Sequence, residues 1–519
     1  MRLSRRQRLA MVMVGVLTLV LVGMASAEPK GKLVMGVPDL GGERLDYSRF
    51  SGTTNQELSR AINRHLIQFG YEGEYVAGTA ESWKSSPDGK VWDLTLKTGV
   101  KWHNGDTLTA QDVVFGVERM KRPEIRAGVF VAQLYNNLVR VEAVDDYHVR
   151  YTFKAPFPVF PYFVNSAPPM PKKYIEKVGD AGFDEKPIGT GPFKFVRRIK
   201  GSEYEFEAFE NFYTGQIPAF KTLIIKIMPE GATRLAALKT GEIDIAKDVQ
   251  GKMLEEVRST PGLKTTSTPS GAVTYIAFAH RYDKNSPWAD LRVRKALAYA
   301  IDKDAIVKGI YRGEATPAVF PDCSFCFGMP KDMKPWPYDP EKAKALLAEA
   351  GYPNGLPGEW DMQCQISGSA PFQPEAVQAV GGFLAKVGIK TKFQVIEGGA
   401  YAAAYKAKKL KGIPPKSGGD TRFDVGLKTD VWAARAEEWS MLNDEDTNKL
   451  WDEQLITVDP EKRRKLLEEA VRIIINDVRL VPFVEMNAIL GLGPRVKEYK
   501  LKKGQVVVTD ALETLKLNN

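Results

Sequence analysis

From about residue 271 onward, segments with the apolar spacing of amphipathic helices alternate with short strand-like segments. Apolar residues that recur every three or four positions predict helices over residues 293–301, 341–350, 374–387 and 460–475, with a strand over 392–396. Strands alternating with helices are typical of open α/β sheets. Such sheets bind ligands beyond the carboxyl ends of their strands, so two such lobes can hold a ligand in the cleft between them.

The first half of the chain predicts a sheet with helical cover. Apolar positions spaced as in a helix predict one over residues 58–69, and Thr109 with Asp112 forms a variant of the capping box that opens another. Alternating or buried apolar residues predict strands over residues 32–37, 92–97, 149–153, 193–195 and 223–228. The fold class predicted for the whole chain is therefore α/β.

The N-terminus reads as an export signal. Four arginines precede an apolar run over residues 9–23, and Ala25 and Ala27 supply the small residues that a signal peptidase accepts. We expect cleavage after Ala27; the alternative, an uncleaved membrane anchor, would ordinarily need about 20 apolar residues. No cysteine follows the run, so we expect a periplasmic protein without a lipid anchor.

The charge of the chain does not indicate nucleic-acid binding. Loss of the four N-terminal arginines would reduce the formal charge from +9 to +5. The remaining basic residues are interspersed with acids, and the brief cluster over residues 406–411 reads as a solvated loop. We therefore expect no nucleic-acid partner.

Three cysteines occur, and two of them form a C-x-x-C motif. In an oxidising compartment Cys323 and Cys326 are expected to form a disulfide, which leaves Cys364 as a buried thiol. A zinc site would need a second ligand pair, which the sequence does not show. A thioredoxin-like redox centre is disfavoured because the motif lies in a Pro/Gly-rich loop and does not open a helix after a strand.

No catalytic pattern stands out. The four histidines include no H-E-x-x-H pair, and there is neither a G-x-S-x-G elbow nor a phosphate-binding loop. His103 is followed by Asn-Gly, which favours a tight turn. Asp112, Asp244 and Asp302 are each explained by helix capping. We therefore expect no enzyme activity, no metal and no cofactor.

A series of motifs resembles the large extracellular solute-binding proteins that serve peptide and nickel ABC importers. The match spans almost the entire mature chain, in the order and spacing of that family. Its best segments are Ala80-Glu-Ser-Trp83, Leu94 to Gly105, Thr109 to Phe115, Gly189 to Phe193, Ala236 to Asp244, Val293 to Asp302, Tyr338 to Leu347 and Val387-Gly-Ile389. Together these motifs are highly specific for the family.

The resemblance implies a type II periplasmic binding protein fold of the large three-subdomain form. Lobe I would span residues 28–270 and include an extra subdomain, lobe II would span 271–489, and residues 490–519 would return to lobe I. Two crossing segments would form the hinge. Closure would then be a population shift toward the state that binds ligand better. The implied partners are a small-molecule ligand and an inner-membrane permease, and we expect a monomer.

The resemblance also places ligand contacts in the cleft. Residues 52–54, with Thr53 and Thr54, would come from lobe I, Thr274 and Tyr275 from the crossover, and Phe372 and Gln373 from lobe II. The floor would be residues 424–439, including Asp430, Trp432, Arg435, Glu438 and Trp439. In peptide-binding members an aspartate in this segment captures the peptide amino group, but here the spacing differs and no Asp-Pro follows.

The ligand class therefore stays open between several possibilities. A peptide-like solute is the first hypothesis, and a saccharide or other amphipathic solute is the second, since two tryptophans could stack on a ring or an apolar side chain. Nickel or haem is disfavoured because His and Cys ligands are scarce near the crossover. A periplasmic hydrolase, or a chaperone or signalling adaptor built on the same shell, is a functional alternative of a different class.

Overall fold

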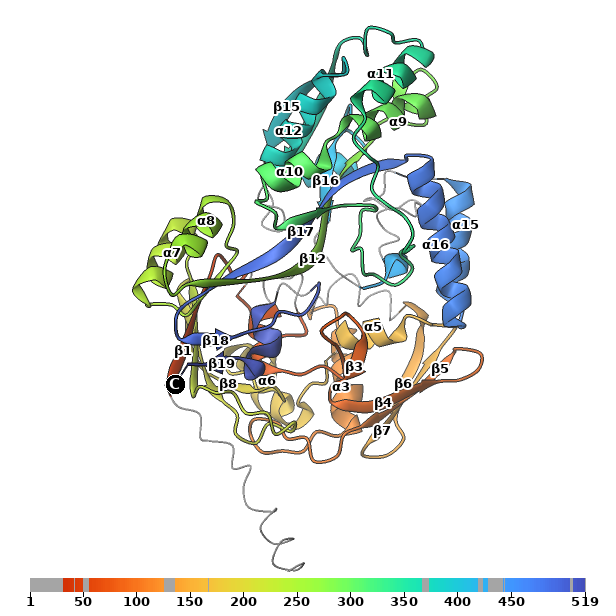
Figure 1. The fold of residues 1–519 in the computed structure, drawn as a ribbon. Helices are drawn as coiled ribbons and strands as arrows, with labels where there is room; N and C mark the ends of the chain where they lie inside the picture. Colours follow the sequence, from red (N-terminus) through yellow and green to blue (C-terminus); the bar gives the residue numbers. More distant parts are fainter. Residues whose placement is uncertain are drawn as a thin grey trace, which may run out of the picture.

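The computed structural model describes residues 31–41, 43–49, 56–125, 136–166, 168–365, 373–418, 423–427, 442, 444–504 and 507–518. Helices and strands form an upper and a lower lobe, joined in the middle by two long strands (Figure 1). The predicted two-lobed α/β fold is confirmed. Within the described ranges no helix combines the length and hydrophobicity needed to cross a bilayer.

The largest sheet has nine strands and runs through both lobes. Its path is β16 (Pro415–Gly418), β12 (Lys264–Ala277), β17 (Leu480–Leu492), β11 (Ile245–Lys247), β1 (Lys32–Val37), β10 (Thr222–Ile227), β9 (Glu203–Ala208) and β8 (Phe193–Ile199), with β13 (Ala315–Pro317) also paired to β17. β1 is parallel to β10 and β11, whereas β12 and β17 are antiparallel to each other. These two long strands connect the lobes (Figure 1).

A bulge bends β12 where it passes between the lobes. The register against β17 shifts between Pro269 and Ala272, and the intervening Gly271 has a φ of 71°, which glycine adopts at little cost. The Ser270 hydroxyl donates to the Met486 carbonyl at 2.6 Å and accepts the Ala272 N–H at 3.2 Å. These side-chain bonds satisfy backbone groups beside the interrupted ladder.

In the lower lobe, helices and the C-terminal segment pack against β1, β9 and β10, and β1 is buried on both faces. Burial alternates along β9, so Tyr204, Phe206 and Ala208 point inward while the acids between them are only half-buried. The surrounding elements are α2 (Gln56–Ile62), α6 (Lys172–Glu185), α7 (Gly231–Thr240), α8 (Gly251–Ser259), β18 (Val496–Glu498), η3 (Val508–Thr514) and β19 (Lys516–Leu517). The C-terminal elements therefore lie beside the first strand of the chain (Figure 1).

A smaller antiparallel sheet forms a subdomain of the lower lobe, at the lower right of Figure 1. Its strands, in spatial order, are β4 (Ala80–Ser85), β5 (Val91–Leu96), β7 (His148–Phe153) and β6 (Leu138–Ala143). α3 (Ala110–Met120), α5 (Phe160–Ser166) and the hairpin of β2 (Ile67–Phe69) and β3 (Tyr75–Ala77) pack with it. The predicted capping box is confirmed: the Thr109 N–H donates to Asp112 Oδ2 at 2.9 Å.

The upper lobe has the predicted alternation of helices and strands. Its elements are α9 (Leu291–Ala300), α10 (Lys303–Gly309), α11 (Pro340–Glu349), β14 (Glu359–Gln365), α12 (Gln373–Ala385), β15 (Lys390–Ile396), α13 (Gly398–Lys406), η2 (Val425–Leu427), α15 (Glu445–Ile456) and α16 (Pro460–Asn476). Asp302, Asp339 and Asp459 cap three of these helices by accepting backbone N–H groups. The helices predicted over 293–301, 341–350, 374–387 and 460–475 are thus confirmed to within two residues at each end.

The helix predicted over residues 58–69 is only half correct. α2 ends at Ile62, and residues 67–69 form β2, which pairs with β3. The apolar residues that suggested a longer helix, Leu66 and Phe69, are buried in the subdomain core. Tertiary packing of that core therefore overrides the local helical spacing.

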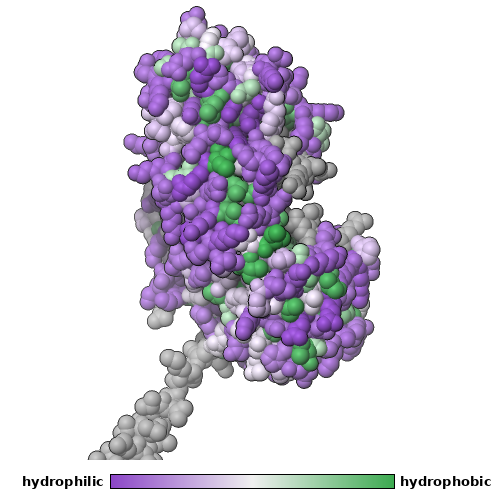
Figure 2. Space-filling model, turned by 90° about the vertical axis from the view of Figure 1, so that its right-hand side faces the viewer, coloured by the Kyte–Doolittle hydropathy of each residue, from purple (hydrophilic) through white to green (hydrophobic). Residues whose placement is uncertain are grey.

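The face of the molecule that carries α15 and α16 is mostly hydrophilic. Figure 2 shows isolated hydrophobic residues on this face, with some near the junction of the two lobes. At the C-terminal end of α15, Leu455 and Ile456 are exposed, and Val458 just beyond it contacts the lower lobe at Gly89. The lobes therefore touch at this edge as well as through β12 and β17.

Candidate functional site

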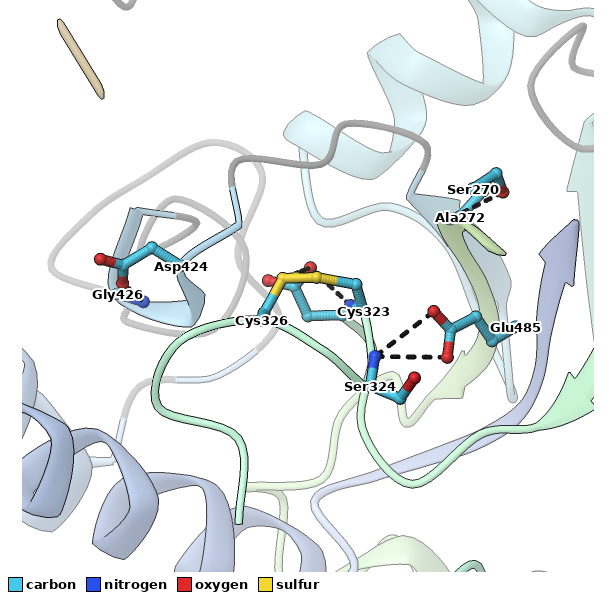
Figure 3. Close-up of a disulfide and its surroundings, with 9 residues drawn as sticks. Ser270, Ala272, Cys323, Ser324, Cys326, Asp424, Gly426 and Glu485 are labelled. Atoms are coloured by element: carbon cyan, nitrogen blue, oxygen red, sulfur yellow. Dashed lines mark hydrogen bonds between the residues drawn. A yellow bond between two sulfur atoms is a disulfide. The ribbon is translucent and has the colours of Figure 1, made fainter. Parts of the chain in front are cut away.

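The disulfide turn lies next to the interlobe strands. Cys323 and Cys326 are bonded as predicted, and the Cys326 N–H donates to the Cys323 carbonyl at 3.1 Å, so the turn is closed twice. Between them, the Ser324 N–H points at the carboxylate of Glu485 on β17, with N–O distances of 3.2 and 3.3 Å (Figure 3). This carboxylate is 2% exposed. The turn is thereby joined to one of the two crossing strands.

Asp322 completes a buried group with the two cysteines. Its Oδ1 accepts the Cys323 N–H at 2.8 Å and lies 3.5 Å from Cys326 Sγ. Asp322, Cys323 and Cys326 lie close enough together to hold a metal ion if the thiols were free. In the disulfide the sulfurs are not thiolates, which are the form that binds metal, so the arrangement serves the disulfide. The predicted free thiol, Cys364, is buried, and burial raises its pKa to about 11.

Three of the predicted ligand contacts lie within the described residues. Thr274 and Tyr275 are on β12, where Thr274 Oγ1 is 2.8 Å from Ser417 Oγ and Tyr275, which hydrogen-bonds Tyr405, is 1% exposed. Gln373 is the first residue of α12 and is fully buried, and neither polar atom of its amide has a hydrogen-bond partner among the residues that the structure describes. Because α12 follows the carboxyl end of β14, Gln373 lies at the edge of the sheet where ligands of α/β proteins bind.

The other predicted contacts lie outside the described residues. These are Gly52, Thr53, Thr54, Phe372, Asp430, Trp432, Arg435, Glu438 and Trp439. Chain next to two of these segments is described: α2 begins at Gln56, and residues 424–427 are the start of the predicted floor. These contacts remain predictions.

A buried ion pair fixes the start of the predicted floor. The Arg463 guanidinium on α16 donates to Asp424 at 2.5 and 3.1 Å, and both side chains are less than a tenth exposed. Asp424 also accepts the Gly426 N–H at 2.8 Å. The motif pattern did not point to Arg463 or Glu485. For Glu485 a signal existed, because it is the one acid in the apolar run 480–492.

The described histidines and aspartates form no catalytic pair. His65 is buried against the Asn165 carbonyl, His148 pairs with the exposed Asp145, and Asp302 caps α10 as expected. Asp244 differs from the expectation, because it caps no helix. Its Oδ2 accepts the Val34 N–H at 2.8 Å and its Oδ1 lies 3.3 Å from Arg495, so it ties β1 to the C-terminal segment.

His103 does lie in the predicted turn, where Gly105 has a φ of 90°. Its Nδ1 accepts the Gly189 N–H at 3.2 Å, so Nε2 carries the proton and donates to the Gly191 carbonyl at 3.0 Å. Burial lowers the pKa of His103 to about 4. The ring is therefore neutral at pH 7 and serves to hold the loop at Gly189 and Gly191.

The lowered pKa of His103 leads us to expect that the stability of the protein depends on pH. The unfolded chain binds a proton near pH 6.5 and the folded chain only near pH 4, so stability falls as the pH is lowered between these values, by about 1 kcal/mol per pH unit. Urea midpoints at pH 7 and pH 5 test this. His103→Gln should lose part of the difference, while His148→Gln, at an exposed position, should retain it. Equal pH dependence in all three proteins would contradict the assignment.

A cavity of about 360 Å³ on the upper lobe does not fit the ligand site. It is lined by α12 and by the first residues of β14 and β15, including Glu359 and Lys390. These are the amino ends of two parallel strands. Ligands of open α/β sheets bind at the opposite, carboxyl edge. The cavity is therefore not assigned to solute capture.

Comparison with known proteins identifies relatives along most of the chain. Residues 74–423 match the family model of bacterial extracellular solute-binding proteins, family 5. The chain is 30% identical over 473 residues to heme-binding protein A of Haemophilus influenzae, covering 86% of each, and 31% identical over 380 residues to the dipeptide-binding protein of Escherichia coli, covering 68% and 69%. DppA of Helicobacter pylori in complex with the peptide STSA superimposes with a TM-score of 0.74 at 25% identity, covering 94% of this chain and 98% of that one.

Proposed function

Because the chain belongs to family 5 of the bacterial extracellular solute-binding proteins, we propose that it captures a peptide-like solute and delivers it to the permease of an ABC importer. The observation that carries the ligand class is the similarity to a dipeptide-binding protein and to a peptide-bound structure, over two thirds or more of each chain. The proteins of this family are transport receptors. We infer that the solute is released unchanged, since capture by closure needs no covalent step.

Capture would proceed by rotation of lobe II, residues 271–489, against lobe I, residues 28–270, with residues 490–519 as part of lobe I. The bulge at Pro269 to Ala272 is the natural bending point of β12, since it is where the ladder with β17 is interrupted. A ligand that touches both lobes binds the closed state better and shifts the population toward it. The C-terminal return is supported by the bonds of Val508 and Thr509 to Glu57 on α2.

The ligand contacts are proposed to be Thr53, Thr54, Tyr275, Phe372, Gln373, Asp430, Trp432, Arg435 and Trp439. Gln373 supports this set, because its buried amide lacks a hydrogen-bond partner within the described part of the chain, and an amide can donate to a ligand carbonyl and accept from a ligand N–H. A peptide offers both groups at every residue. Unpaired buried amides are costly, so a partner supplied by the ligand would stabilise the closed state.

Haem, which the name of the Haemophilus influenzae relative indicates for that protein, has less support here. Among the described histidines, His65 and His103 bond to backbone carbonyls and His148 pairs with Asp145. Only His280, exposed in the turn that follows β12, has no bond of this kind. The chain therefore offers few candidates for an axial ligand.

Replacement of Trp432 by alanine tests the proposed floor. Loss of a buried aromatic anchor at the centre of an interface should weaken binding by at least about 30-fold, with little change in melting temperature. Isothermal titration with tripeptides measures the first and differential scanning fluorimetry the second. Trp451→Ala is the matched control, because Trp451 is 1% exposed in the upper-lobe core and its loss should lower the melting temperature. A destabilised Trp432→Ala protein would identify Trp432 as a core residue instead.

The site of action is proposed to be the periplasm, after export and cleavage of residues 1–27, with no lipid anchor and as a monomer. The expected mature N-terminus is Glu28, because Ala25 and Ala27 occupy the positions that signal peptidase reads. Intact mass measurement of protein from the periplasmic fraction checks the cleavage. A mass that retains the first 27 residues would contradict it.

A further inference from the structure

Phe423 belongs to the chain of the upper lobe but packs in the core of the lower-lobe subdomain. Its ring is 6% exposed and lies 4.3 Å, between centroids, from the ring of Phe69 on β2. A Cβ at Gly73, in the turn that follows β2, would collide with the Phe423 ring. The Phe423 ring therefore packs against the hairpin of β2 and β3, in a space that is open because residue 73 is a glycine.

The backbone of Phe423 is in a conformation that phenylalanine rarely adopts. Its φ is 57°, in the left-handed region, where a bulky residue is strained and persists only when its surroundings hold it. The Phe423 carbonyl accepts the Phe327 N–H at 2.8 Å, and the Val425 N–H donates to the Phe327 carbonyl at 3.1 Å. The adjacent Asp424 is held by Arg463. The upper lobe thus fixes this backbone while the lower lobe takes its side chain.

The disulfide turn supplies the other side of the contact. Phe325 lies between the two bonded cysteines, and its ring centroid is 5.9 Å from that of Phe423. Phe325 packs against both the subdomain core and the upper-lobe core that contains Cys323 and Cys326. Three aromatic rings, Phe69, Phe423 and Phe325, therefore form a row across the lobe boundary. We call this row the interlobe latch.

We propose that the interlobe latch holds the two lobes together in the closed conformation and that the Cys323–Cys326 disulfide holds the latch in place by fixing the turn that carries Phe325. This inference rests on the proposed function, in which closure captures the solute. It adds a device that acts with or without ligand.

Disulfide formation would complete the latch only in an oxidising compartment. The thiols of Cys323 and Cys326 lose two protons and two electrons in exchange with a disulfide oxidant, which leaves as two thiols. Before this step only hydrogen bonds hold the turn, namely the backbone bond from Cys326 to Cys323 and the bonds to Asp322 and Glu485. A fully formed latch would thus mark chains that have been exported and oxidised.

Hydrogen exchange of the intact, ligand-free protein tests the latch across the lobe boundary. In Cys323→Ser/Cys326→Ser, amides of the β2–β3 hairpin, such as those of Gly70 and Gly78, should exchange about 3- to 10-fold faster, in line with loss of an aromatic pair. Cys364→Ser, also in the upper lobe, is the matched control and should leave the hairpin unchanged. An increase confined to residues 318–330 would overturn the proposal.

A second variant separates the contribution of the Phe325 ring from that of the Cys323–Cys326 disulfide. Phe325→Ala keeps the disulfide and should still accelerate exchange in the β2–β3 hairpin, because the row of rings is broken. Unchanged exchange in this variant would overturn the role of the row. Titration of the unmodified protein with tripeptides is run alongside: absence of binding there would contradict the proposed function while leaving the exchange result, and hence the latch, intact.

Discussion

Glu57→Leu is expected to lower the free energy of unfolding by about 3–5 kcal/mol, since removal of one partner leaves the other charge buried and unpaired. Glu57 is fully buried on α2, and its Oε1 accepts from the Lys247 ammonium at 2.7 Å. It also accepts the N–H groups of Val508 and Thr509, each at 3.0 Å. The variant therefore leaves the Lys247 ammonium and the two backbone N–H groups without their acceptor.

Urea unfolding followed by tryptophan fluorescence measures this effect. Glu72→Leu is the matched control, because Glu72 also contacts the C-terminal segment, through Lys503, but on the exposed surface, where such pairs contribute about 0–1 kcal/mol. We expect the control to stay within that range. A loss below about 1 kcal/mol for Glu57→Leu would show that the C-terminal segment is not anchored through this carboxylate.

Arg119→Met should have an effect of similar size in the other part of the lower lobe. Arg119 is fully buried at the end of α3 and donates to Asp46 at 2.6 and 3.2 Å and to Asp180 at 2.7 and 2.9 Å. Burial alone would lower the pKa of Arg119, but the two carboxylates outweigh it and raise the pKa. Without the guanidinium, the fully buried Asp46 carboxylate keeps only one counter-charge, that of the partly exposed Arg49 at 3.0 Å.

The expected loss at pH 7 is again about 3–5 kcal/mol, measured by urea unfolding. Arg122→Met provides the comparison, because Arg122 follows on the same stretch of chain but is exposed, and surface changes usually stay within about 0.5 kcal/mol. Equal midpoints for the two variants would contradict the role assigned to Arg119.

Local sequence signals were sufficient for most of the upper lobe. Asp339 before Pro340 and Asp459 before Pro460 set the start of α11 and α16 by capping, and the structure places both helices there. The same holds for Thr109 and α3. Such signals act over a few residues, so a single sequence contains them in full.

What the sequence could not supply are contacts between distant segments. Residues 67–69 form a strand because β3 and the subdomain core are available to pair with them, which the helical spacing of Leu58 to Phe69 does not reveal. The meeting of Phe325 with Phe423, and of Arg463 with Asp424, depends on how whole elements pack. Family resemblance supplied the remaining site residues, and only Gln373 and the two residues on β12 fall in the described part of the chain.

Native mass spectrometry of the protein purified from its own periplasm tests the central claim most directly. The account predicts a 1:1 complex whose released ligand, identified after denaturation, is a short peptide or peptide-like solute with its bonds intact. Addition of the same solute to stripped protein should then raise the melting temperature, with a stabilisation that grows as the logarithm of its concentration over the dissociation constant. A co-purified sugar or haem, or a peptide cleaved during incubation, would contradict peptide capture by a non-enzymatic receptor.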